Sequence, residues 1–112
     1  MIKIKNYFFY NDSKKEELGN GVSRKILAYN GNLMTVEVNF EKNAIGNLHS
    51  HPHEQMTYVL EGEFVFKIGN EEKIVKAGDV LYKQPDIEHG CLCLKKGKLI
   101  DIFTPIREDF IK

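Results

Sequence analysis

The chain has 112 residues, and its 16 basic and 16 acidic side chains cancel to a formal net charge of zero. A chain of this length folds around a single core, so we expect one domain over residues 1–112. Because the charges balance, the protein has no net positive field that would attract the phosphate backbone of a nucleic acid, which argues against nucleic-acid binding. Residues 1–10 contain no long apolar stretch. We therefore expect no signal peptide, no membrane span and a cytoplasmic location.

Short segments of alternating or apolar residues, separated by turn residues, follow one another along the chain. The predicted strands are 22–29, 33–40, 57–60, 64–68, 73–76, 80–83, 90–94 and 99–103. We expect hairpins at Gly62 and Gly69, a turn over residues 95–98 and a loop over residues 12–21. No segment has the period of a long helix. The pattern is typical of an all-β sandwich or barrel.

Histidines gather in one short segment. His49 and His51 are two residues apart, so on a β-strand both imidazoles would point to the same side, and Gln55 can return to that side after an irregular step at Pro52. His89 is the only histidine outside this segment. Imidazole nitrogens with one amide oxygen suit a first-row transition metal and leave coordination positions open. The sequence therefore predicts that these four residues bind one divalent metal, such as zinc, nickel, manganese or iron.

Three further residues near the predicted metal site have open interpretations. His53 is not at a ligand position, so we expect it not to bind the metal, and its role near the pocket stays open. Cys91 and Cys93 share a face with His89 by strict alternation, which puts both thiols in the interior. They are either small apolar core residues, or one of them forms a closed structural zinc site with two histidines. Cysteines so close in sequence rarely pair, so we expect no disulfide.

An acidic residue interrupts the last predicted strand. Asp101 stands between Ile100 and Ile102, where a carboxylate is costly unless it is paired, hydrated or functional. Arg107 is its natural partner. One interpretation is therefore an ion pair between Asp101 and Arg107 that closes the end of the barrel. The other is a role for both residues in chemistry.

The segments that carry the histidines resemble the two sequence motifs of the cupin family, over residues 43–62 and 78–93. Asn43 stands where the first motif usually has Gly, and Asn enters the left-handed region more readily than most residues. Pro85 lies one place later than usual, and Cys93 stands where the second motif often has Asn. The resemblance implies a single-domain cupin, which is an all-β double-stranded β-helix or jelly-roll barrel.

Residues 49–55 and 101–109 are similar to the corresponding segments of the KdgF-type pectin degradation proteins. These are small cupins that convert 4,5-unsaturated uronates to linear keto forms. The resemblance implies that His49, His51, Gln55 and His89 hold the metal. It also implies a catalytic role for three residues of the tail, Asp101, Phe103 and Arg107.

This chemistry is coherent with the side chains present. A metal with open positions can stabilise developing negative charge, and Arg107 can clamp the substrate carboxylate. Asp101 then exchanges the proton, while Phe103 excludes water. Two alternatives remain open, namely a metal-dependent dioxygenase of a small enol or aromatic substrate and a non-catalytic sugar-binding cupin. Ile100 and Ile102 face away from Asp101 and form an apolar stripe, so we expect a homodimer that covers it.

Overall fold

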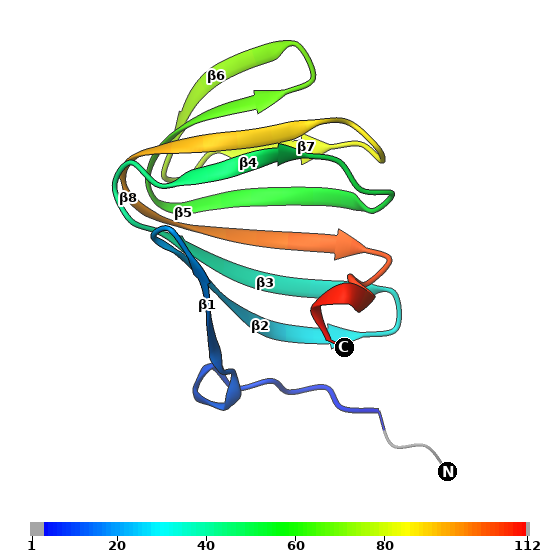
Figure 1. Ribbon diagram of the computed structural model, residues 1–112. Helices are drawn as coiled ribbons and strands as arrows, with labels where there is room; N and C mark the ends of the chain where they lie inside the picture. Colours follow the sequence, from blue (N-terminus) through cyan, green and yellow to red (C-terminus); the bar gives the residue numbers. More distant parts are fainter. Residues whose placement is uncertain (1–3, 112) are drawn as a thin grey trace.

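The computed structural model describes residues 4–111, which form strands and two short 3-10 turns (Figure 1). The strands are β1 (Lys15–Gly19), β2 (Val22–Asn30), β3 (Leu33–Phe40), β4 (Ile45–His49), β5 (Glu54–Ile68), β6 (Glu71–Lys76), β7 (Val80–Lys83) and β8 (His89–Thr104). The 3-10 turns are η1 (Tyr10–Asp12) and η2 (Glu108–Phe110). The expected all-β class is confirmed. No helix within residues 4–111 is long and apolar enough to cross a membrane.

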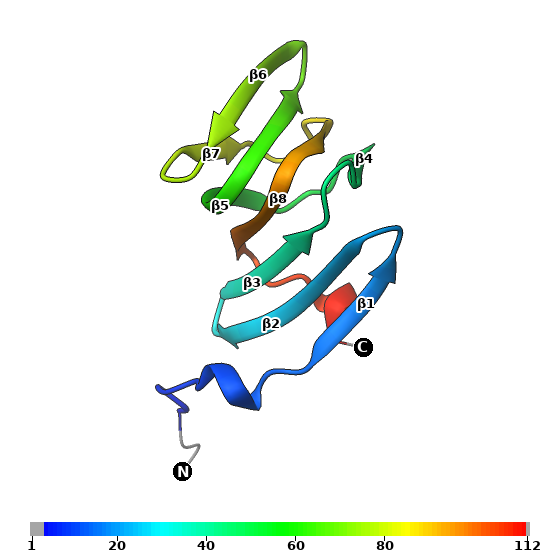
Figure 2. The ribbon, with the colours of Figure 1, turned by 90° about the vertical axis from the view of Figure 1, so that its left-hand side faces the viewer.

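Two long strands, β5 and β8, organise the fold. They pair antiparallel along most of their length, and each contributes one half to each of two sheets. The first half of β5 and the second half of β8 lie in a sheet with the order β1-β2-β3-β8-β5-β7. Their other halves lie in a smaller sheet with the order β4-β8-β5-β6. Figure 1 shows both strands bending at the left, and Figure 2 shows that bent side from the front.

Glycines allow the two long strands to bend against each other. Gly62 in β5 has a φ of 88°, and a Cβ atom there would lie 2.6 Å from the Cα of Gly97 and 2.6 Å from the carbonyl oxygen of Lys95. No side chain fits in that space. The predicted hairpin at Gly62 and the predicted turn over residues 95–98 are therefore wrong, because each lies at a bend within one continuous strand.

The other local predictions have mixed outcomes. The strands over 22–29 and 33–40 are confirmed as β2 and β3, and the hairpin at Gly69 joins β5 to β6. Asn43 has a φ of 71°, as expected for a residue in place of the usual Gly. The predicted loop over residues 12–21 is wrong, because it contains β1, which pairs with β2. This edge strand is charged and mostly exposed, so it lacks the apolar alternation by which strands are recognised.

The apolar core lies at the bent end of the barrel and leaves the opposite end for polar side chains. One cluster of buried residues surrounds the bends and consists of Phe40, Ala44, Val59, Phe64, Phe66, Leu81, Cys93 and Leu99. A smaller cluster under β3 contains Met34, Val36 and Phe103. The end of β4 and the starts of β5 and β8, where His49, Gln55 and His89 lie, are thus at the open end of the same barrel.

Candidate metal centre and its cavity

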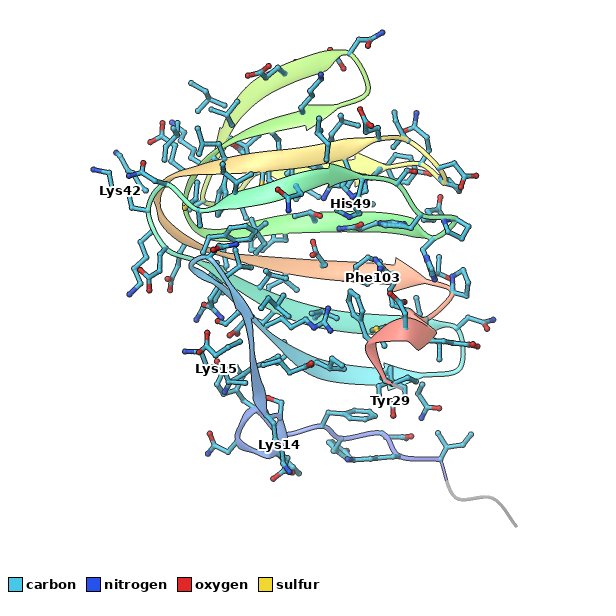
Figure 3. All side chains as sticks on the ribbon, in the orientation of Figure 1. Lys14, Lys15, Tyr29, Lys42, His49 and Phe103 are labelled. Atoms are coloured by element: carbon cyan, nitrogen blue, oxygen red, sulfur yellow. The ribbon has the colours of Figure 1, made fainter. Side chains whose placement is uncertain are left out.

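Three histidines converge at the open end of the barrel. One ring nitrogen from each of His49, His51 and His89 lies within 4.8 Å of the others. The first and last of these residues are cross-strand partners on β4 and β8. His51 follows β4 in an irregular segment, so the expectation that it lies on the strand with His49 is wrong, although both rings reach the same place. Figure 3 shows His49 and Phe103 toward the end of the strands away from the bend.

The backbone selects the same tautomer for the neutral form of all three rings. Each Nδ1 atom lies within hydrogen-bonding distance of a carbonyl oxygen, which can only accept a hydrogen bond, so Nδ1 carries the proton. The donor and acceptor pairs are His49 to Asn47 at 2.8 Å, His51 to His53 at 3.2 Å and His89 to Ile87 at 3.0 Å. Each neutral ring therefore offers its Nε2 lone pair. This arrangement is the one that metal-binding histidines commonly adopt.

Burial keeps two of these imidazoles neutral. It lowers the pKa of His51, with the positive charge of Arg107 as a further cause. Burial also lowers the pKa of His89 to about 3, and the charge of Lys83 acts in the same direction. A proton at Nε2 is disfavoured at neutral pH for both residues. Their lone pairs are thus available to a metal without competition from protons.

Thr57 links the fourth predicted ligand to two charged residues. Its hydroxyl donates a hydrogen bond to Asp101 Oδ1 at 2.7 Å, because an ionised carboxylate can only accept. The same oxygen accepts from Lys83 Nζ at 3.0 Å and from Gln55 Nε2 at 3.1 Å. The single proton and both lone pairs of the Thr57 hydroxyl are then all in use. Thr57 is completely buried, so water does not compete for these bonds.

The hydrogen bonds of Thr57 determine which way the amide of Gln55 points. Since the hydroxyl proton goes to Asp101, Gln55 must present its Nε2 to Thr57 and its Oε1 to the histidines. Oε1 lies 2.9 Å from His51 Nε2, and neither atom carries a proton in this arrangement. Two facing lone pairs without a proton are unfavourable unless a cation lies near them. The donor set of three Nε2 atoms and one Oε1 atom therefore fits a divalent transition metal.

A cavity of about 150 Å³ adjoins these groups. Its walls include His49, Gln55 and His89 and all three residues of the tail, Asp101, Phe103 and Arg107. Larger hollows, of about 430 and 400 Å³, lie elsewhere on the surface, and no histidine lines either one. Three of the four predicted ligands and all three predicted catalytic residues thus line one small space, and the fourth ligand, His51, adjoins it through the histidine cluster.

Arg107 does not pair with Asp101. Its guanidinium donates from Nε and Nη2 to the carboxylate of Asp109 at 3.1 and 2.9 Å, and this hydrogen bonding lowers the pKa of Asp109. The guanidinium also packs 4.3 Å from the ring centroid of Phe110 and 5.4 Å from that of Phe103. The interpretation in which Asp101 and Arg107 form a structural ion pair is therefore wrong. Both side chains line the cavity without neutralising each other.

The cysteines do not form a closed zinc site with the histidines. Among residues 4–111, the only cluster with metal-binding geometry is that of the three histidines. Cys93 lies in the core, where its thiol faces the carbonyl oxygens of Phe40 and Lys95. Cys91 lines the cavity, and burial raises its pKa to about 11, so it remains a thiol. Both cysteines are free, as expected.

His53 approaches the site without joining the cluster of three histidines. Its ring centroid lies 5.3 Å from that of His51 and 6.4 Å from that of Phe103. Its Nδ1 atom is buried and has no hydrogen-bond partner among the described residues. His53 thus lies beside the site, next to His51 and Phe103.

Two residues of the site, Thr57 and Lys83, are absent from the sequence-based predictions. Alternation along β5 places Thr57 on the same face as Gln55 and Val59, and alternation along β7 places Lys83 on the same face as the buried Leu81. That signal is present in the sequence. It conflicts with the usual expectation that lysine is exposed, and here the alternation is correct.

Comparisons with known proteins agree with the fold and the arrangement of the site. Residues 36–103 match the cupin domain. The pectin degradation protein KdgF of Dickeya dadantii is 41% identical over 110 residues, which cover 96% of this chain and 100% of that protein. The structure of an RmlC-like cupin from Shewanella frigidimarina superposes with a TM-score of 0.90 at 39% identity, covering 98% of this chain and 99% of that one.

The structure of KdgF from a Halomonas species also has a TM-score of 0.90, at 30% identity, and the match covers 96% of this chain and 99% of that one. These matches extend over nearly the whole length of each protein, so they include both histidine segments and the tail. The expected jelly-roll barrel is thereby confirmed. The chain belongs to the cupin family and, within it, to the small single-domain cupins that include KdgF.

Proposed function

We propose that this protein is a metal-dependent enzyme that converts 4,5-unsaturated uronates from pectin or alginate breakdown to linear keto forms. The observation that carries the proposal is the gathering of two predicted residue sets around one cavity. One set offers the lone pairs for a metal, and the other supplies an acid, an aromatic wall and a guanidinium. The similarity over the full length to a pectin degradation protein supports the same substrate class.

The proposed metal ligands are His49, His51, Gln55 and His89. When bound there, a divalent metal supplies Lewis-acid stabilisation of negative charge on a substrate oxygen. The reaction needs no oxidant. Opening the hemiacetal ring of an unsaturated uronate leaves an enol, and loss of its O–H proton with gain of a proton at carbon gives the ketone.

Asp101 is the group proposed to move that proton. Its Oδ1 atom is held by Thr57, while its Oδ2 atom accepts no hydrogen bond from the described residues and belongs to a side chain that lines the cavity. A carboxylate with one oxygen fixed and one free is positioned to accept a proton and return it. This division of the two oxygens supports the catalytic interpretation over the structural one.

Arg107 and Phe103 are proposed to bind and shield the sugar. Asp109 takes two of the five N–H donors of Arg107, so three remain for a substrate carboxylate. Phe103 is almost fully buried between the histidines and Phe110, where it provides an apolar wall. A cavity of about 150 Å³ is well below the ~300–1,000 Å³ of drug-sized pockets, which favours a single sugar unit over an oligomer.

The direct test is to incubate the metal-loaded protein with unsaturated galacturonate and follow the loss of alkene absorbance. We expect loss of absorbance that is faster than the spontaneous reaction and that stops when the metal is removed by a chelator. A rate equal to that of the buffer alone, with metal bound, would rule out the proposed activity. Parallel measurement with unsaturated units from alginate distinguishes the two sources of uronate.

A further inference from the structure

Lys83 is a buried cation whose charge no acidic residue contacts. It ends β7 and its side chain lines the cavity, yet the residue is only 3% exposed. Thr57 Oγ1, at 3.0 Å, is the one hydrogen-bond acceptor that its Nζ finds among residues 4–111. The same ammonium lies 4.7 Å from the ring centroid of Phe66. Since an ammonium has three N–H donors, at least one has no oxygen or ring to face.

The other cations around the cavity each have an acidic partner. Arg24 forms an ion pair with Glu16 at 3.4 Å, and Arg107 forms one with Asp109 at 2.9 Å. No such pair involves Lys83 in the described part of the chain. Burial lowers the pKa of Lys83, so its charged form is costly unless a counter-charge reaches it. Of the three cations that line the cavity, Lys83 is the one that lacks a partner.

We infer that Lys83 is an anion-binding residue of this cavity, whose ammonium receives a carboxylate oxygen of a bound sugar acid. The choice of a sugar acid rests on the proposed function, whereas the need for an anion comes from the unpaired ammonium alone. A carboxylate has two oxygens, so one oxygen can contact Lys83 while the other makes the contact proposed for Arg107. The two cations together would favour uronates over neutral sugars of the same shape.

Asp101 offers a competing explanation for the buried charge. It lies one hydroxyl away from Lys83, through Thr57, and so attracts the ammonium across that bridge. In that case the two charges balance each other and Lys83 serves only to hold the fold. Such a bridge leaves the remaining donors of Lys83 unused, whereas a ligand carboxylate would use them. The two interpretations differ in whether Lys83 affects the binding of an acid.

Binding of galacturonate and of its uncharged methyl ester to the metal-loaded protein separates these interpretations. Both ligands lack the alkene, so neither one is turned over by the proposed reaction. We would compare wild type, Lys83→Met and Arg24→Met by calorimetry at constant salt. Arg24→Met removes a charge from the same cavity but from a residue that already has a partner. Thermal melts establish that each variant is folded, and Lys83→Gln replaces Lys83→Met if the latter does not fold.

We expect wild type to prefer the acid over the ester, and Lys83→Met to reduce this preference at least tenfold. Arg24→Met should keep the preference within twofold of wild type. An unchanged preference in folded Lys83→Met, or no preference for the acid in wild type, overturns the inference. Turnover of unsaturated galacturonate is measured separately. A wild type that binds galacturonate through Lys83 but turns over no uronate contradicts the proposed function and leaves this inference in place.

Discussion

Thr57 holds the site together through a single hydroxyl, and replacing it with valine tests that arrangement. Val has nearly the same shape as Thr but no hydroxyl, so Thr57→Val removes the hydrogen bonds to Gln55, Lys83 and Asp101 at once. The amide of Gln55 is then free to turn its Oε1 away from the histidines. We expect this variant to lose both stability and metal affinity.

The size of the effect follows from the partners of the lost bonds. Hydrogen bonds to charged groups contribute about 1.5–3 kcal/mol each and a neutral one about 1 kcal/mol. Two of the three partners, Lys83 and Asp101, are charged. Gln55, Lys83 and Asp101 line the cavity although Thr57 does not, so water can solvate these three partners once the hydroxyl is gone. The low end of the ranges therefore applies, and we expect a decrease of about 4 kcal/mol in the free energy of unfolding. In a domain of this size that lowers the melting temperature by roughly 15 °C.

Thr57→Ser is the matched control, because it keeps the hydroxyl and removes only a methyl group, at a cost of about 1 kcal/mol. Metal affinity measured by competition with a chromogenic chelator should fall about 10–100-fold in Thr57→Val, as for other residues that orient metal ligands, and should stay near wild type in Thr57→Ser. If the two variants melt within about 3 °C of each other and bind metal equally well, Thr57 does not organise the site.

Further substitutions test the remaining assignments. His51→Ala and His89→Ala should each abolish stoichiometric metal binding, and unchanged metal content in both would remove the metal assignment. Asp101→Asn should keep the fold and the metal but lose turnover by about 100-fold or more, because an amide cannot exchange a proton; full specific activity would exclude the catalytic role. Arg107→Lys should mainly weaken uronate binding, since a point charge does not reproduce a bidentate clamp. Light scattering at micromolar concentration should give the mass of a dimer, because Ile102 and its neighbours on the outer face are exposed, and a monomeric mass would refute this.

The sequence singles out the histidines that converge at the candidate site because ligand chemistry restricts the choice of side chains. Few residue types offer a neutral nitrogen lone pair, so three closely spaced histidines and His89 stand out in a short chain. Their convergence depends on strand pairing, which places His49 opposite His89. The predicted strand position of His51 is wrong, yet its ring still arrives at the site. The choice of candidate ligands thus depends less on the predicted local structure than the predicted path of the backbone does.

The bends in the long strands were not predictable from local signals. A glycine at positive φ flanked by apolar segments is equally typical of a hairpin and of a strand that changes direction. The difference lies in the pairing partner. Both halves of β5 pair with β8, and a hairpin would have paired them with each other. That choice depends on contacts between residues far apart in the sequence, which periodicity within one segment does not contain.

Lys83 and Thr57 show a different limit of reasoning from sequence. Alternation along β7 indicates that Lys83 points inward, but a buried lysine is acceptable only if acceptors are present, and those acceptors lie on other strands. Thr57 comes from β5 and its acceptor Asp101 from β8, so the three residues meet only after the sheet has formed. The position of Asp101 within an apolar strand already indicated that it needs a partner. That partner is the hydroxyl of Thr57, which in turn accepts a hydrogen bond from the ammonium of Lys83. Polar residues on the inward face of several strands are therefore best interpreted together, because each one explains how another can be buried.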